Sequence, residues 1–473
     1  MTQDRPPGHR YLVLGICCLS LFIVGIDSTA VNLALPSISD DLHASPAQLQ
    51  WVVDAYTLVL ASLLMLAGSM GDRFGRRRVF QTGLVLFGIG SLLCSAAPTP
   101  ELLIGARMLQ AIGGSMLNPV AMSIITNTFR APRERAQAIG VWGGVVGLSM
   151  ALGPVIGGAL VDTVGWRSIF WLNIPVVIAA VVLTTRYVPE SRAERARRLD
   201  PVAQLLIIIL LASVIFAIIE GRSLGWTSPA VIGCFVAAAV ATVVLVVHES
   251  RRDEPLLDPR FFRSVPFTSA ALSAILGFSA LAGFLFLNTL YLQDVRGLTP
   301  LHAGLMTLPM AVATAVFAPI SGRIVGTRGP RLPMMLAGGG IGLSAALLMQ
   351  VRADTSLLYL GFAYLAFGIG FGLLNAPITN AAVSGMPREQ AGVAAAIAST
   401  SRQVGSSLGV AVLPAIALAN LDGPLATGLP AASHAAWAVM LGCGIGLLVL
   451  AVAATSAPAR RSSERVAAEL GAA

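Results

Sequence analysis

A single acidic residue stands in a long apolar stretch near the start of the chain. Asp27 lies within residues 11–36, YLVLGICCLSLFIVGIDSTAVNLALP, after an uncharged run that begins at Tyr11. An ionised carboxylate in hydrocarbon costs a few kcal/mol, so a membrane protein that keeps one usually turns it toward a polar interior. A carboxylate can also gain and lose a proton. The position therefore favours proton transfer or the binding of a cationic ligand.

Two more charged side chains interrupt apolar stretches in the same part of the chain. Arg107 lies six residues inside a stretch that begins near Glu101, roughly 9 Å at 1.5 Å per residue, and Asp54 lies near the outer end of residues 51–71. A guanidinium favours the ionised form of a nearby carboxylate, whereas burial favours the neutral form. We expect Asp27, Asp54 and Arg107 to cluster in the outer half of one bundle, where Arg107 is a cation near the carboxylates and Asp27 shares protons with Asp54. Alternatively, Arg107 extends to the membrane surface along its aliphatic stem.

The composition indicates that membrane-spanning helices position these charged residues. The chain has 473 residues, of which 56% are hydrophobic and 11% charged, against about 25% charged residues in soluble proteins. A membrane span needs about 20 apolar residues, and we count fourteen such stretches along the sequence. Most of the 31 basic residues, all arginine, fall on one side of these spans together with both termini, which predicts cytoplasmic termini. The sequence thus predicts an all-α polytopic membrane protein.

The placement of the arginines and the absence of lysine argue against nucleic-acid binding and against an ATP-driven function. The net charge of +8 follows from topology, so we expect no nucleic-acid partner. A nucleotide-binding GxxxxGK[ST] loop cannot exist in a chain without lysine, which argues against ATP as the energy source. The first stretch also has the basic flank of a cleavable signal peptide, but its acidic residue and the thirteen later spans favour a membrane helix.

An internal repeat divides the chain. Residues 68–78, GSMGDRFGRRR, and 322–332, GRIVGTRGPRL, share Gly and Arg at equal spacing, and each follows the second span of a six-span block. Repeated halves with a site between them are common in secondary transporters. The predicted parts are a six-span bundle at 1–190, two inserted spans with a cytoplasmic connector at 191–266, a second six-span bundle at 267–457, and a cytoplasmic tail that frays at 458–473.

The first copy of the repeat resembles a known signature. GSMGDRFGRRR matches the form GxxxDRxGRR that follows the second span in the major facilitator superfamily. The resemblance implies two six-helix bundles with two inserted helices, and a latch at the cytoplasmic mouth that gates alternating access. The matching latch residues are Gly68, Asp72, Arg73, Gly75 and Arg76. Gly326 replaces the acid in the second copy, so only the first latch is complete. The alternative is a short basic loop that merely obeys the charge rule.

Further stretches narrow the resemblance to the 14-span drug:proton antiporters, including the methylenomycin-resistance group. LGPVIGG at 152–158 is similar to their antiporter motif, with Gly153, Pro154, Gly157 and Gly158 at the matching positions. Residues 26–36, 50–58, 103–113 and 166–175 are also similar to motifs of that group. Glycines in spans also serve plain helix packing, which is the alternative for residues 152–158.

The resemblance implies a transporter of the bacterial plasma membrane and not an enzyme. We expect a monomer in the lipid bilayer that exports lipophilic or cationic small molecules, driven by protons, without a cofactor or metal. The alternatives are a dedicated exporter of an endogenous metabolite, lipid or self-made antibiotic, a proton-coupled importer, and a non-transporting receptor. Candidate cavity residues are Asn32, Tyr56, Gln110, Asn118, Trp142, Asn288, Arg402 and Gln403. For Arg402, snorkelling to the cytoplasmic surface is an equal alternative.

Overall fold

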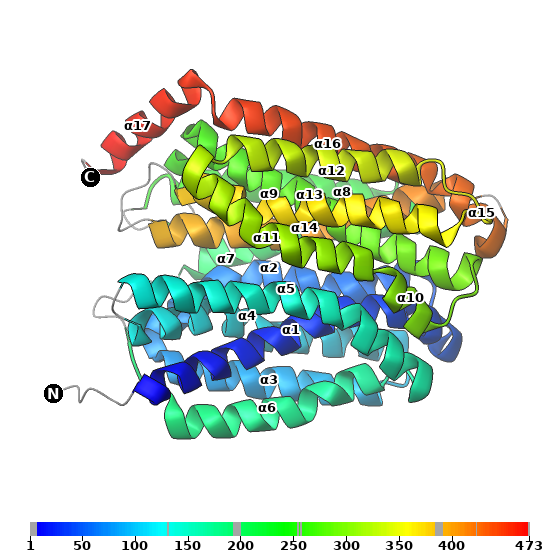
Figure 1. Ribbon diagram of the computed structural model, residues 1–473, viewed down its shortest axis with the longest axis horizontal. Helices are drawn as coiled ribbons and strands as arrows, with labels where there is room; N and C mark the ends of the chain where they lie inside the picture. Colours follow the sequence, from blue (N-terminus) through cyan, green and yellow to red (C-terminus); the bar gives the residue numbers. More distant parts are fainter. Residues whose placement is uncertain are drawn as a thin grey trace. The chain divides into compact units, whose positions relative to one another are not determined.

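The computed structural model describes residues 7–129, 132–192, 200–252, 255, 258–383, 391–421 and 423–471. Every regular element within these ranges is a helix (Figure 1). Thirteen helical segments there are long and apolar enough to cross a membrane, and Leu152–Thr163 adds a shorter apolar stretch of another helix. The all-α polytopic fold predicted from composition is confirmed, and the predicted count of fourteen spans is close.

The contacts divide the chain into two compact units, Met1–Pro201 and Val202–Ala473. The finer division at residues 190, 266 and 457 stays a prediction. The first unit holds six long helices, which are α1 (Pro7–Leu42), α2 (Pro46–Phe74), α3 (Arg76–Ala96), α4 (Pro100–Thr128), α5 (Pro132–Thr163) and α6 (Ser168–Tyr187).

Local sequence signals set the ends of these helices. The Ser45 side chain accepts a hydrogen bond from the Gln48 backbone, and the Gln48 side chain accepts one from the Ser45 backbone, so α2 begins with a capping box. The Thr99 side chain accepts a hydrogen bond from the Leu102 backbone and so caps the start of α4. Proline follows each of these caps, where its missing N–H is no loss. Helix α2 ends at Gly75, whose φ of 113° disfavours any residue with a side chain.

The second unit begins with two peripheral helices, α7 (Pro201–Leu224) and α8 (Pro229–Glu249). Only 28% and 22% of the residues in their spans are buried, against 72% for the span that contains α9, so both helices present apolar surface outward. The other elements are η1 (Pro259–Arg263), α9 (Val265–Leu290), η2 (Tyr291–Val295), α10 (Pro300–Met306), α11 (Leu308–Arg328), α12 (Arg331–Leu348), α13 (Leu357–Val383), α14 (Ala391–Ala419), α15 (Leu425–Ala432) and α16 (His434–Ala454).

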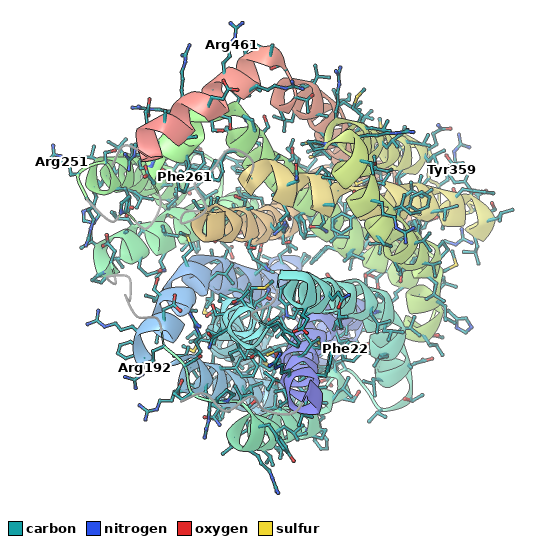
Figure 2. The ribbon with its side chains drawn as sticks, turned by 60° about the vertical axis from the view of Figure 1, so that its left-hand side comes forward. Phe22, Arg192, Arg251, Phe261, Tyr359 and Arg461 are labelled. Carbon is teal, nitrogen blue, oxygen red and sulfur yellow. The ribbon has the colours of Figure 1, made fainter. Side chains whose placement is uncertain are left out.

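The C-terminal segment is ordered, contrary to the expectation that it frays. Residues Ala457–Gly471 form helix α17, and α15 and α17 lie at opposite ends of α16 (Figure 1). The Ser462 hydroxyl accepts a hydrogen bond from the Val265 backbone at 3.0 Å, and Val466 is buried. Arg461 points away from the helix (Figure 2). Small residues on one face and charged residues on the other make this helix amphipathic, which explains why it docks.

Candidate functional site

Asp27 lies on α1 at the centre of a closed set of polar side chains. Its side chain has no exposed surface. Its Oδ2 accepts a hydrogen bond from Arg107 Nη1 at 2.5 Å. Its Oδ1 accepts from Gln110 Nε2 and from Asn173 Nδ2, both at 2.9 Å. The structure therefore brings Asp27 and Arg107 together, and among the described residues the donors to the carboxylate come from α4 and α6. We call Asp27, Arg107, Gln110, Asn173 and Ser91 the Asp27 cage.

Arg107 belongs to the interior of the first unit. Its Nε donates to the Val52 carbonyl at 3.2 Å, and its Nη1 also reaches Gln110 Oε1 at 2.6 Å. The guanidinium lies over the ring of Tyr56, 4.2 Å from the ring centroid, where the electron-rich face attracts a cation. The side chain is 1% exposed. This burial rules out the alternative in which Arg107 snorkels to the membrane surface.

Two members of the cage were not predicted from the sequence. The Ser91 hydroxyl on α3 accepts from Gln110 Nε2 at 2.8 Å and from Asn173 Nδ2 at 3.1 Å. Each amide nitrogen thus donates one hydrogen to Asp27 and the other to Ser91. Asn173 stands in the stretch 166–175 that carries a family resemblance, and its polar side chain in an apolar run was the available signal. Ser91 gave no such signal, because single serines are common in membrane helices.

The charges of the Asp27 cage balance only while Asp27 is ionised. When Asp27 is ionised, its negative charge cancels the positive charge of the Arg107 guanidinium. Gln110 Nε2 and Asn173 Nδ2 donate hydrogen bonds to the other carboxylate oxygen. When Asp27 takes a proton, Arg107 keeps its positive charge without a counter-ion in a buried site. An uncompensated buried charge is costly.

Asp54 is buried on α2 but lies outside the cage. Its Oδ1 accepts a hydrogen bond from the Thr57 hydroxyl at 3.0 Å. The side chains that hydrogen-bond Asp27 and the acceptors of Arg107 do not include Asp54. The shared role expected for Asp54 stays a prediction.

The glycines of residues 152–158 press α5 onto the turn of α1 that carries Asp27. A Cβ atom on Gly157 would lie 2.6 Å from the Ala30 Cβ and 2.8 Å from the Ala30 Cα. A Cβ on Gly153 would collide with the Thr29 hydroxyl and lie 3.4 Å from the Ile26 Cα. Pro154 and Gly158 are buried in the same turn region of α5. The close approach couples the position of α5 directly to the helix that holds the carboxylate.

At the cytoplasmic end of the first unit, Asp72 pairs with Arg76. Arg76 donates from Nε at 3.1 Å and from Nη2 at 2.8 Å to Asp72 Oδ1. Arg73, the other predicted basic partner, is exposed and lies over the ring of Phe74. A Cβ atom on Gly68 would lie 3.7 Å from the Pro119 Cβ on α4, an ordinary van der Waals distance, so the contact does not require glycine here. The ion pair of the predicted latch is thus Asp72–Arg76.

Glu190 anchors this latch and was not predicted. Its Oε1 accepts from the Arg77 backbone at 3.1 Å and from the Ser191 backbone at 3.0 Å. The Arg76 backbone in turn donates to the Ser191 carbonyl at 2.9 Å. A Cβ at Gly75 would lie 2.6 Å from Glu190 Oε1. The segment after α6 therefore caps the start of α3.

We expect Glu190→Ala to destabilise the first unit by about 1–3 kcal/mol, because two backbone N–H groups lose their acceptor. Arg78→Ala is the matched control, since it removes only the exposed 3.8 Å ion pair to Glu190, for which we expect less than about 1 kcal/mol. Thermal unfolding of the purified variants in detergent measures both effects. Equal losses in the two variants would contradict a capping role for Glu190.

Comparison with known proteins decides the family. Residues 17–410 match the model of the Major Facilitator Superfamily. The chain belongs to the major facilitator superfamily. It is therefore a multi-pass transporter of the plasma membrane and not an enzyme, as the sequence predicted.

Individual relatives extend this assignment. The chain is 38% identical to the "Multidrug resistance protein Stp" of Mycobacterium tuberculosis over 86% of this chain and 76% of that protein. It is 36% identical to the "Methylenomycin A resistance protein" of Streptomyces coelicolor over 89% of this chain and 88% of the relative. A bacterial homologue of the lysosomal transporter Spinster has the same fold, with a TM-score of 0.67 at 19% identity over 98% of this chain and 99% of that one.

The remaining candidate residues of this superfamily member fall into two groups. In the first unit, one polar atom each of Asn32, Asn118 and Trp142 is buried and has no hydrogen-bond partner among the described residues. Such atoms are costly unless water or a ligand satisfies them, which favours a cavity-lining position. In the second unit, Asn288 is 2% exposed and accepts from the Tyr364 hydroxyl at 2.7 Å, so its partner is a core side chain.

One group of side chains in the described ranges has the spacing of metal ligands. Asp200, His248 and Glu249 each place a ligand atom within 4.8 Å of the others. Arg252 Nη1 lies 3.4 Å from His248 Nε2, so a cation already faces the histidine ring. Asp200 directly precedes α7, where an acid serves the exposed N–H groups of the helix start. These local roles account for the group, and the absence of a metal stays a prediction.

Proposed function

We propose that the protein is a proton-coupled antiporter that exports lipophilic or cationic drugs by alternating access, with no cofactor and as a monomer. The observation that carries the proposal is the buried ion pair between Asp27 and Arg107, which is neutral only while Asp27 is ionised. Resistance to several drugs in the relative Stp, and resistance to one antibiotic in the methylenomycin relative, support export of such compounds.

The proposed cycle follows from the cage. A proton from outside binds Asp27 and leaves Arg107 without its counter-ion, which favours the rearranged state. The close packing of Gly157 against Ala30 transmits a shift of α1 to α5. Loss of the proton to the cytoplasm restores the ion pair and the starting state. A membrane potential of 100 mV adds about 2.3 kcal/mol for each charge that crosses.

Transport in everted vesicles tests the coupling. Vesicles that respire on lactate and contain the protein should accumulate ethidium faster than vesicles without it. Nigericin, which collapses the pH gradient, should abolish this faster accumulation of ethidium. Ethidium accumulation that persists after both the pH gradient and the membrane potential are collapsed would contradict proton coupling.

A second candidate is a dedicated exporter of one metabolite or self-made antibiotic. The similarity to the methylenomycin A resistance protein favours it, because that relative is named for a single compound. Expression in a drug-hypersensitive host separates the two candidates. Protection against one compound in a broad panel supports the dedicated exporter, whereas protection against unrelated lipophilic cations supports multidrug export.

A further inference from the structure

Arg402 is a membrane-embedded cation with no acidic partner in the part of the chain that the structure describes. It lies on α14 eleven residues after Ala391, roughly 16 Å along the helix. Its Nη2 donates to the Thr379 hydroxyl on α13 at 2.7 Å, and its Nη1 donates to the Ser399 hydroxyl at 3.2 Å. Its Nε is buried, and none of the described residues forms a hydrogen bond with it. No carboxylate among the described residues of the chain forms an ion pair with it.

This arrangement contrasts with the other arginine inside a span. Arg107 is neutralised by Asp27, whereas the partners of Arg402 among the described residues are two neutral hydroxyls. An arginine inside a membrane helix is costly on insertion scales, and neutral hydrogen bonds offset only part of such a cost. A bound anion would remove the excess positive charge.

The guanidinium also has unused donors that a ligand can reach. Arginine carries five N–H donors in a planar fork, and two of them serve Thr379 and Ser399. Arg402 is half-buried, while Thr379 and its neighbour Asn380 are exposed. The surroundings therefore leave an approach to the outer edge of the guanidinium. A planar carboxylate with two oxygens matches that edge better than a single-atom anion does.

We propose that Arg402, positioned by Thr379 and Ser399, binds the carboxylate of a transported compound, so that the substrates include lipophilic organic acids as well as cations. The inference rests on the proposed export function, but it concerns a separate position in the second unit. Snorkelling, the alternative left open by the sequence, stays a prediction, because Thr379 lies four residues before the end of α13 at Val383 and the Arg402 side chain extends to it.

Equilibrium binding to the purified full-length protein in detergent tests this site. The probes are 1-pyrenebutyrate and its neutral analogue 1-pyrenebutanol, followed by fluorescence anisotropy. Arg402→Gln should weaken binding of pyrenebutyrate at least tenfold, which corresponds to about 1.4 kcal/mol, and should change the affinity for pyrenebutanol less than twofold. Arg402→Lys should keep part of the preference for the acid. Arg323→Gln, which removes an exposed arginine of α11, is the matched control and should behave as wild type.

Other results would overturn the proposal. An unchanged affinity ratio of the two probes in Arg402→Gln, or an equal loss of both, would show a structural role for Arg402. Displacement of pyrenebutyrate by 10 mM inorganic phosphate would reassign the position to a small free anion. If Arg402→Gln does not fold, the Thr379→Val and Ser399→Ala double variant should still lower the ratio about threefold, and an unchanged ratio would count against the site. Binding needs no proton gradient, so a protein that binds pyrenebutyrate but fails to transport would contradict the export function alone.

Discussion

The Asp27→Asn variant should lose proton-driven export, with a fall of at least a hundredfold in ethidium accumulation by energised vesicles. Asparagine keeps the shape of the side chain but cannot exchange a proton. It also leaves Arg107 buried without its counter-ion, which costs about 3–5 kcal/mol. A loss of transport in this variant alone would thus combine lost coupling with lost stability.

A double variant separates these two effects. Asp27→Asn with Arg107→Gln removes both charges, so the site is neutral again and the unfolding temperature should recover most of its loss. Ethidium accumulation should stay absent, because no group in the cage titrates. Asp54→Asn provides the comparison for the second acid on α2. Recovery of proton-driven export in the double variant would contradict the assignment of the coupling proton to Asp27.

The Gly157→Ala variant should have the second largest effect. The added Cβ would lie 2.8 Å from the Ala30 Cα, and backbone must move to relieve the contact. Overpacking of this kind costs about 1–3 kcal/mol. Because the contact joins α5 to the turn that holds Asp27, we expect export to fall at least tenfold. Initial rates in vesicles, corrected for the amount of folded protein, measure this loss.

Matched variants show whether the contact itself is responsible. Gly105→Ala adds the same methyl group to α4 where nothing lies within 4 Å, so transport should stay near wild type. Ala30→Gly removes the nearest atom facing Gly157, and combined with Gly157→Ala it should restore part of the rate. A Gly105→Ala variant as impaired as Gly157→Ala would point to a general effect of helix composition.

The charged centre of the site could be predicted because charge in an apolar run is rare. Asp27 and Arg107 stand out individually, and their pairing across 80 residues of sequence follows from the cost of leaving either alone. Ser91 and Asn173 could not be predicted to join them. Neutral polar residues are ordinary in membrane helices, and their role depends on which helices pack together, which local sequence does not specify.

The latch and helix α17 also depend on tertiary contacts that local sequence does not specify. The motif at 68–78 pointed to Asp72, but the choice of Arg76 over Arg73 follows from the i, i+4 geometry across the end of α2. Glu190 joins the latch from a segment more than 100 residues away. The docking of α17 depends on its contacts with η1 and α9, and a short Ala- and Arg-rich sequence does not show such contacts by itself.

The most direct test of the account is the release of protons on substrate binding. Purified protein in weakly buffered detergent solution is mixed with tetraphenylphosphonium, a lipophilic cation, and the change in pH is recorded. The account predicts that the wild type and Asp54→Asn release protons, and that Asp27→Asn binds or rejects the cation without releasing any. Proton release by Asp27→Asn equal to that of the wild type would contradict the claim that Asp27 carries the coupling proton.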